Sequence, residues 1–254
     1  MEWIEQRLFE LKDTESQYRM FNARVVATAD PATMLGVRVP KLRRLAKEIL
    51  RSDSRDAFLE ELPHTYYEEY LLHAFVLNEE KDAERTIAEL GRLLPFVDNW
   101  AVSDALMPKS FRKLPAVRLE ELSRKWMASK HEYTKRFGIS LLMHYLLPEH
   151  FRPEHLMWAK EADDGRYYVE MMIGWYVAEA LVTQEETVLP FIEAKVLPEK
   201  TERIAIQKAL DSRRIAPTMK EQPAPDSRHA LIFDMKNAPV CKEAKAPEHI
   251  GFPR

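Results

Sequence analysis

Residues 98–106, DNWAVSDAL, belong to a series of five stretches that share a helical pattern and recur at a nearly constant interval. The others are TYYEEYLLHAF at 65–75, HEYTKRFGISL at 131–141, RYYVEMMIGW at 166–175 and KTERIAIQKAL at 200–210. In register, the intervals are 33, 33, 35 and 34 residues between equivalent positions, which are Tyr67, Trp100, Tyr133, Tyr168 and Glu202. A steady period in the thirties, with two helices per unit, predicts a helical solenoid whose second helices line a concave groove.

The segments outside this series also have the spacing of helices. Apolar residues recur three and four positions apart in LRRLAKEIL at 42–50 and LEELSRKWM at 119–127, as expected for helices that bury one face. The two-residue alternation of a half-buried strand is hard to find. Prolines fall between the segments, where they would limit helix ends, at Pro40, Pro63, Pro108, Pro115, Pro148, Pro153, Pro190 and Pro198. The predicted fold class is therefore all-α.

The composition changes after residue 220. Residues 221–254 are rich in proline, alanine and polar side chains, with one short apolar patch at 231–233. A segment of this composition buries too little apolar surface to fold alone. We therefore expect a solenoid domain over residues 1–220 and a Pro-rich, weakly ordered tail over 221–254.

The bulk composition excludes several classes of protein. No apolar run among the 254 residues reaches the length of a membrane span, and the N-terminal MEWIEQRLFELKD is not a signal peptide. Glycine-rich phosphate loops are absent, the histidines lack the spacing of a zinc or iron site, and no serine lies in a nucleophile elbow. The single cysteine, Cys241, suits a reducing compartment. We expect a cytoplasmic monomer that contacts no membrane and needs no metal or organic cofactor.

Positive charge is concentrated in two stretches, although the net charge is -3. RVPKLRRLAK at 38–47 contains no acid. The stretch from 109 to 136 contains nine basic residues and only three glutamates. Either stretch alone is typical of a solvated helix face, whereas two in one acidic chain favour an anionic polymer as partner. The candidate binding residues are Arg38, Lys41, Arg43, Arg44, Lys109, Arg112, Lys113, Lys130 and Lys135.

Trp100 and Asp104 raise the question of a site within the repeat. Residues four apart lie on one face of a helix, so the indole and the carboxylate should point the same way. Taken alone, a large aromatic side chain usually serves burial. Both residues lie on a second helix, however, as do Arg136 and Trp175. All four are therefore expected to face one groove, although they span 75 residues of sequence.

Over most of residues 34–215 the chain resembles the HEAT-like-repeat DNA alkylation repair proteins, the AlkD-type DNA glycosylases. The motifs that carry the resemblance are the Trp-x3-Asp pair in DNWAVSDAL, the arginine in YTKRFGIS and the tryptophan in MIGW. They correspond to Trp100 with Asp104, to Arg136 and to Trp175. The resemblance implies a HEAT-like α-α superhelix, and a catalytic groove that acts on alkylated double-stranded DNA without flipping the base into a deep pocket.

The residue types suit this chemistry. Alkylation of a purine ring nitrogen makes the base cationic and a good leaving group, so a general acid is unnecessary, unlike in ordinary glycoside hydrolysis. One carboxylate, which we assign to Asp104, can stabilise the positive charge that develops on the deoxyribose and orient a water. Trp100 and Trp175 offer π faces to the cationic nucleotide, and the planar fork of Arg136 suits a backbone phosphate.

Two residues support a second hypothesis. Asn99 precedes Trp100 where the active relatives have an aromatic residue, and Glu170 stands where a basic residue is expected. Both favour a non-catalytic HEAT-like solenoid that binds DNA or a protein through the same groove. Excision of alkylated purines such as 3-methyladenine and 7-methylguanine would distinguish a glycosylase from this alternative.

Overall fold

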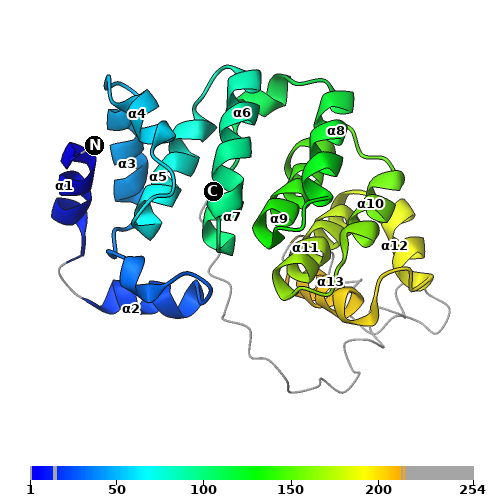
Figure 1. Cartoon of the computed structure of the whole chain (residues 1–254). Helices are drawn as coiled ribbons and strands as arrows, with labels where there is room; N and C mark the ends of the chain where they lie inside the picture. Colours follow the sequence, from blue (N-terminus) through cyan, green and yellow to red (C-terminus); the bar gives the residue numbers. More distant parts are fainter. Residues whose placement is uncertain (1, 14–15, 213, 215–254) are drawn as a thin grey trace. The chain divides into compact units, whose positions relative to one another are not determined.

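The computed structural model describes residues 2–13, 16–212 and 214, and these residues contain thirteen α-helices and no strand (Figure 1). The predicted all-α class is confirmed. Residues 221–254, where the sequence predicts a weakly ordered tail, lie outside the described residues.

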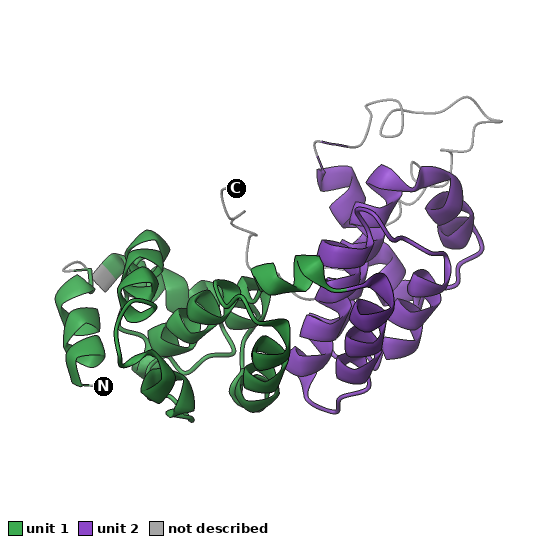
Figure 2. Ribbon diagram, turned by 90° about the horizontal axis from the view of Figure 1, so that it is seen from above, with its two compact units in different colours: residues 1–114, 242–254 green, residues 115–241 purple. Residues whose placement is uncertain are grey.

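The chain divides into two compact units between Leu114 and Pro115 (Figure 2). The described part of the first unit contains α1 (Glu2–Leu11), α2 (Ser16–Val25), α3 (Val39–Ile49), α4 (Arg55–Glu60), α5 (Tyr67–Asn78), α6 (Ala83–Leu93) and α7 (Trp100–Ala105). Short 3-10 turns at Pro31–Thr33, Leu94–Phe96 and Lys109–Lys113 complete it. The prediction that one domain covers both units stays a prediction.

The second unit begins at α8 (Ala116–Met127), which leads into α9 (Glu132–Leu141). A π-helical turn at Leu142–Leu146 directly follows α9. The remaining helices in the described part of the unit are α10 (Glu154–Ala162), α11 (Tyr167–Thr183), α12 (Glu185–Glu193) and α13 (Glu199–Asp211).

The repeat register predicted from the sequence is confirmed by the helix boundaries. Tyr67 and Trp100 are the first residues of α5 and α7, and Tyr133 and Tyr168 are the second residues of α9 and α11. Glu202 lies in the first turn of α13. In the first unit α5 packs against α7, and in the second α11 packs against both α9 and α13. The second helices thus stack consecutively within each unit, which is the packing of a helical solenoid.

The second helices form the core because they are apolar on most sides. In α5, every residue from Tyr67 to Asn78 is buried except Tyr70. In α11, ten residues of the seventeen are buried. A helix that is apolar all round must be covered on all sides. Other helices of the same unit supply this cover, as α3 and α6 do for α5 and as α10 and α12 do for α11.

Glu68 fixes the connection between α2 and α3 in the first unit. Its side chain is fully buried and accepts hydrogen bonds from three successive backbone N–H groups, at 2.9 Å from Leu35, 2.7 Å from Gly36 and 3.2 Å from Val37. Gly36 has a φ of 87°, and a Cβ there would lie 3.0 Å from the Cβ of Arg19 on α2. The glycine therefore permits both the left-handed turn and the close approach of α2.

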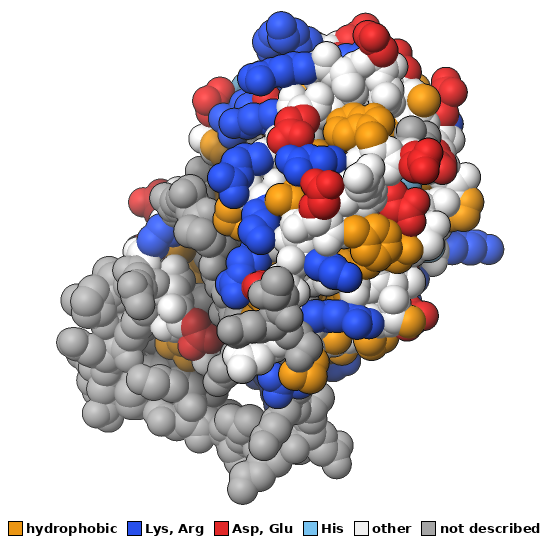
Figure 3. Space-filling model, turned by 90° about the vertical axis from the view of Figure 1, so that its left-hand side faces the viewer, with side chains coloured by type: hydrophobic (Ala, Val, Ile, Leu, Met, Phe, Trp, Pro, Cys, Tyr) orange, Lys and Arg blue, Asp and Glu red, His pale blue; other side chains and the backbone are white. Residues whose placement is uncertain are grey.

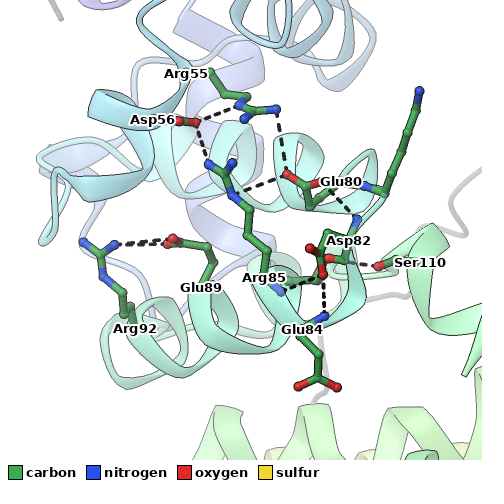
Figure 4. Close-up of polar contacts among 11 residues, drawn as sticks. Arg55, Asp56, Glu80, Asp82, Glu84, Arg85, Glu89, Arg92 and Ser110 are labelled. Atoms are coloured by element: carbon green, nitrogen blue, oxygen red, sulfur yellow. Dashed lines mark hydrogen bonds and ion pairs between the residues drawn. The ribbon is translucent and has the colours of Figure 1, made fainter.

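Ion pairs link α4 to α6 on the surface of the first unit (Figure 4). Arg85 lies 2.5 Å from a carboxylate oxygen of Asp56 and 3.5 Å from one of Glu80, and Arg55 lies 2.8 Å from Asp56. Hydrogen bonds from Arg55 and Arg85 hold the pKa of the Asp56 carboxyl below its usual value. These arginines have partners within the unit, so we do not count them among the residues that could bind a ligand.

A buried histidine pair makes the first unit sensitive to acid. His64 Nε2 lies 2.9 Å from His73 Nδ1, and the two rings pack against Phe58. Burial lowers the pKa of His64 from 6.5 to about 4, and burial together with His64 and Arg92 lowers that of His73. The folded state therefore favours neutral rings, and protons bind more readily to the unfolded chain.

We expect the pair to cause no loss of unfolding free energy above pH 6.5, and the unfolding free energy to fall as the pH drops toward 4. A shift of this size for His64 corresponds to about 3 kcal/mol at the acidic end. Urea unfolding of the full chain at a series of pH values measures it. His64→Gln should make the unfolding free energy less dependent on pH. His150→Gln, at an exposed site, should leave the pH dependence unchanged. An acid dependence that is identical in His64→Gln and the wild type would contradict the assignment.

Candidate functional site

Helix α7 presents Trp100 and Asp104 on its accessible face. The helix has only six residues, of which Ala101, Val102 and Ser103 are buried and Trp100, Asp104 and Ala105 are half-buried. Trp100 and Asp104 lie one turn apart, so the indole and the carboxylate share the half-buried side of the helix.

Two asparagines define the ends of this short helix. Asn99 caps its start, because its side-chain oxygen accepts a hydrogen bond from the Val102 N–H at 3.0 Å. At the other end, Asn78 of α5 donates to the Ala105 carbonyl at 2.7 Å and accepts from the Met107 N–H at 2.6 Å. A helix of six residues would not be stable alone, and these bonds fix where Asp104 lies.

The Trp100 ring is fixed by a contact with α2. Its Nε1 donates a hydrogen bond to the Val25 carbonyl at the end of that helix, at 3.2 Å. The residues are separated by 75 positions in the sequence, so only the tertiary fold brings them together. One edge of the indole is therefore occupied, and the half-buried ring keeps a defined orientation beside Asp104.

Trp175 lies on the accessible stripe of α11 in the second unit. The half-buried residues Tyr168, Met171, Trp175 and Glu179 follow one another at spacings of three and four, and their neighbours on the other sides are mostly buried. The Trp175 ring meets the His144 ring edge-on with centroids 6.5 Å apart, and the Lys208 ammonium lies 5.8 Å from its centroid. Neither of these two neighbours was identified from the sequence, because they belong to other segments of the chain.

Gly174 explains why a glycine precedes Trp175 in MIGW. A Cβ on Gly174 would lie 2.5 Å from the Ile204 Cγ2 and 3.0 Å from the Ala205 backbone nitrogen of α13. Only a residue without a side chain allows α11 and α13 to pack so closely, and this packing holds Lys208, one turn beyond Ile204, over the indole.

Gly174→Ala is expected to lower the unfolding free energy by about 1–3 kcal/mol, because α13 must move away from α11. Gly91→Ala is the matched control, since nothing lies within 4 Å of that position on α6. It should be neutral, or stabilising by up to about 1 kcal/mol, because alanine favours the helix. Thermal or urea unfolding measures both variants, and an equal response from the two would contradict the close contact.

Arg136 is placed differently from the other three predicted site residues. It is only 3% exposed, and its Nη1 donates a hydrogen bond to the Tyr168 carbonyl at 2.7 Å. The arginine therefore connects α9 to the first turn of α11. Its burial favours a role in positioning α11, and the predicted contact with a phosphate stays a prediction.

The two departures from the family motifs serve the fold. Asn99 is 2% exposed and forms the cap described above. Glu170 is 4% exposed and pairs with Lys200 of α13, its Oε2 lying 2.5 Å from the Lys200 Nζ. Glu170 therefore does not add an unpaired negative charge to the accessible stripe of α11.

The predicted basic residues fall into two groups. Arg44, Arg112, Lys113 and Lys130 are exposed, and their side chains have no ion pair within the described part of the chain. The others have partners in their own unit. Arg38 pairs with Asp13, Lys109 with Glu79 and Lys135 with Asp164, the Lys41 ammonium donates to the Leu11 carbonyl, and Arg43 lies over the Phe75 ring.

Lys135 is largely enclosed, with a side chain only 12% exposed. Hydrogen bonds from Arg166 and Lys135 hold the pKa of the Asp164 carboxyl far below its usual value. On the face drawn in Figure 3, Lys and Arg side chains follow one another along one side, with Asp and Glu side chains among them. The exposed, unpaired cations are thus the stronger candidates for contacts with an anionic partner.

The four predicted site residues are divided between the units. Trp100 and Asp104 belong to the first, and Arg136 and Trp175 to the second. Their convergence on one groove stays a prediction. Over residues 2–13 and 16–212, no three His, Cys, Asp or Glu side chains form a group that could hold a metal ion. No helix in the described ranges is long and apolar enough to cross a membrane.

The family model for DNA alkylation repair enzymes matches residues 4–212. The chain belongs to this family. The match runs from α1 to the end of α13 and so includes both units, and it confirms the resemblance found in the sequence. A comparison with curated proteins finds no match. Family membership associates the chain with DNA repair and indicates DNA as its partner.

Proposed function

We propose that this member of the DNA alkylation repair family is a DNA glycosylase. It hydrolyses the N-glycosidic bond of cationic alkylated purines, of the 3-methyladenine or 7-methylguanine type, in duplex DNA. The observation that carries the proposal is the pair on α7, an indole and a carboxylate one turn apart on the half-buried side of a helix that is anchored at both ends.

Asp104 supplies the negative charge that stabilises the reacting sugar. When the C1'–N bond breaks, its electron pair leaves with the cationic base, which becomes neutral without a proton from the enzyme. Positive charge then develops at C1', and the Asp104 carboxylate stabilises it. A water polarised by the same carboxylate adds to C1' and loses a proton to it or to solvent, leaving an abasic deoxyribose.

The two tryptophans bind the nucleotide, and Arg136 positions the helix that carries one of them. The π faces of Trp100 and Trp175 attract a cationic base or an electron-poor sugar, by about 0.5–2 kcal/mol each. Because Arg136 is bonded to the start of α11, we assign it to positioning the helix that presents Trp175. Contacts to DNA phosphates come mainly from the exposed cations, with Arg44, Arg112, Lys113 and Lys130 as the first candidates.

Release of 3-methyladenine or 7-methylguanine from methylated duplex DNA tests the proposal. We expect the full chain to release at least one of these bases above the spontaneous rate without added metal or cofactor. No release from either lesion, together with intact duplex binding, would instead support a non-catalytic DNA-binding solenoid. The two residues that favour this alternative, Asn99 and Glu170, both have roles within the fold, so we do not propose it.

A further inference from the structure

Tyr168 is fixed in the first turn of α11 by residues of α9, the helix that packs beside it (Figure 1). Its backbone N–H donates a hydrogen bond to Glu132 Oε1 at 3.1 Å, and its carbonyl accepts one from Arg136 at 2.7 Å. The Tyr133 and Tyr167 rings pack against its own ring, with centroids 5.6 Å and 5.0 Å away. The backbone and the ring of Tyr168 therefore have a defined orientation.

The Tyr168 hydroxyl has no hydrogen-bond partner among the described residues. The residue is half-buried. The buried polar atoms that lack a partner in the described chain include the hydroxyl of Tyr176 on the same helix but not that of Tyr168, so the Tyr168 hydroxyl reaches the surface. Burial of the ring raises the pKa of the Tyr168 phenol above its ordinary value of 10. The hydroxyl is therefore a neutral hydrogen-bond donor at physiological pH.

Tyr168 lies on the same accessible stripe of α11 as Trp175. Two helical turns separate the residues, which corresponds to about 10 Å along the helix axis. One strand of duplex DNA rises about 3.4 Å per nucleotide. A strand that meets Trp175 and follows the stripe therefore has a phosphate beside Tyr168, about three nucleotides away.

The charges near Tyr168 are compatible with a phosphate. Glu132 keeps its negative charge when it accepts the hydrogen bond from the backbone N–H. Arg136 on the same helix opposes it, and Arg136 lowers the pKa of the Tyr168 phenol more than Glu132 raises it. A hydroxyl can also bind a phosphate oxygen without a free cation, and tyrosine is one of the side chains that contact phosphates in protein–DNA complexes.

We propose that the Tyr168 hydroxyl donates a hydrogen bond to a backbone phosphate of duplex DNA. The inference rests on the proposed function, in which the same strand meets Trp175. A phosphate contact fixes the position of the strand without reading its sequence, so Tyr168 sets where the DNA lies along α11. Glu132 and Arg136 support the contact by holding the first turn of this helix.

Duplex binding by full-length Tyr168→Phe tests this contact. The variant loses one oxygen atom and keeps the ring. We expect it to bind duplex DNA about tenfold more weakly, as for the loss of one hydrogen bond to a charged group. The slope of log Kobs against log salt should stay unchanged, because a neutral hydroxyl neutralises no phosphate charge.

Tyr176→Phe is the matched control. It removes the same atom from the same helix, but the Tyr176 hydroxyl is buried without a partner and lies out of reach of DNA. Duplex binding by Tyr176→Phe should equal that of the wild type. Urea unfolding should show that neither variant is less stable than the wild type, since neither hydroxyl forms a hydrogen bond in the described chain.

Each outcome decides between the two proposals. Wild-type affinity in Tyr168→Phe, or equal losses in Tyr168→Phe and Tyr176→Phe, overturns the phosphate contact. A selective loss of affinity with a smaller salt slope also overturns it, because the hydroxyl would then act through a cation. A selective loss at an unchanged slope supports the contact, and if the wild type releases no alkylated base, the glycosylase alone is overturned. Absence of salt-sensitive duplex binding by the wild type overturns both.

Discussion

Asp104→Asn is expected to lower the rate of release of a cationic alkylpurine by about 100-fold or more. The amide keeps the size and much of the hydrogen bonding of the carboxylate but cannot neutralise the charge that develops at C1'. One placed group of this kind contributes roughly 3 kcal/mol to transition-state stabilisation, which corresponds to about two orders of magnitude in rate. Single-turnover release from methylated duplex DNA at saturating enzyme measures it.

Binding separates this effect from a loss of DNA affinity. Removal of an acid near DNA should not weaken attraction to the phosphates, so duplex binding by Asp104→Asn should equal or exceed that of the wild type. Asp53→Asn removes one exposed acid elsewhere in the first unit and should retain wild-type release. Equal release of the alkylpurine by Asp104→Asn and Asp53→Asn would show that Asp104 has no role in the mechanism.

Glu68→Ala should strongly destabilise the first unit. The substitution leaves the backbone N–H groups of Leu35, Gly36 and Val37 without their common acceptor in a buried place. A buried donor without a partner costs about 1–3 kcal/mol, so we expect the unfolding free energy to fall by about 4 kcal/mol. Urea unfolding at neutral pH measures the loss.

A conservative variant provides the control for Glu68. Glu68→Gln keeps an oxygen that can accept two of the three bonds but presents an amide NH2 to the third N–H, so it should lose clearly less stability than Glu68→Ala. Hydrogen exchange at residues 35–37 should become faster in both variants. A loss below about 1 kcal/mol in Glu68→Ala would show that water replaces the carboxylate at little cost.

Much of the architecture could be predicted because helical periodicity is local. The apolar spacing and the prolines indicate where helices begin and end, and the interval from Tyr67 to Trp100 and onward predicts which helices are equivalent. The equivalent positions lie at the helix start or up to three residues after it, which confirms this register. The shared face of Trp100 and Asp104 follows from the same rule, since a spacing of four needs no knowledge of the neighbouring helices.

The roles of the other residues could not be predicted from spacing. Arg136 has the sequence context of a groove residue, but its guanidinium is buried against the start of α11. Glu170 carries a negative charge that would repel DNA from the groove, but it pairs with Lys200 on another helix. In each case the partner lies about thirty residues away in the sequence, and helical periodicity gives the direction of a side chain without identifying what it meets.

By itself, the sequence determined the all-α class, the repeat register and the pair of Trp100 and Asp104 on one helix face. Only the tertiary structure decided that Val25 orients the Trp100 ring, that Gly174 brings α13 against α11, and that His144 and Lys208 surround Trp175. The physical reason is that backbone hydrogen bonding in a helix depends on near neighbours in the chain. The surroundings of a side chain depend instead on the close packing of helices that are distant in sequence.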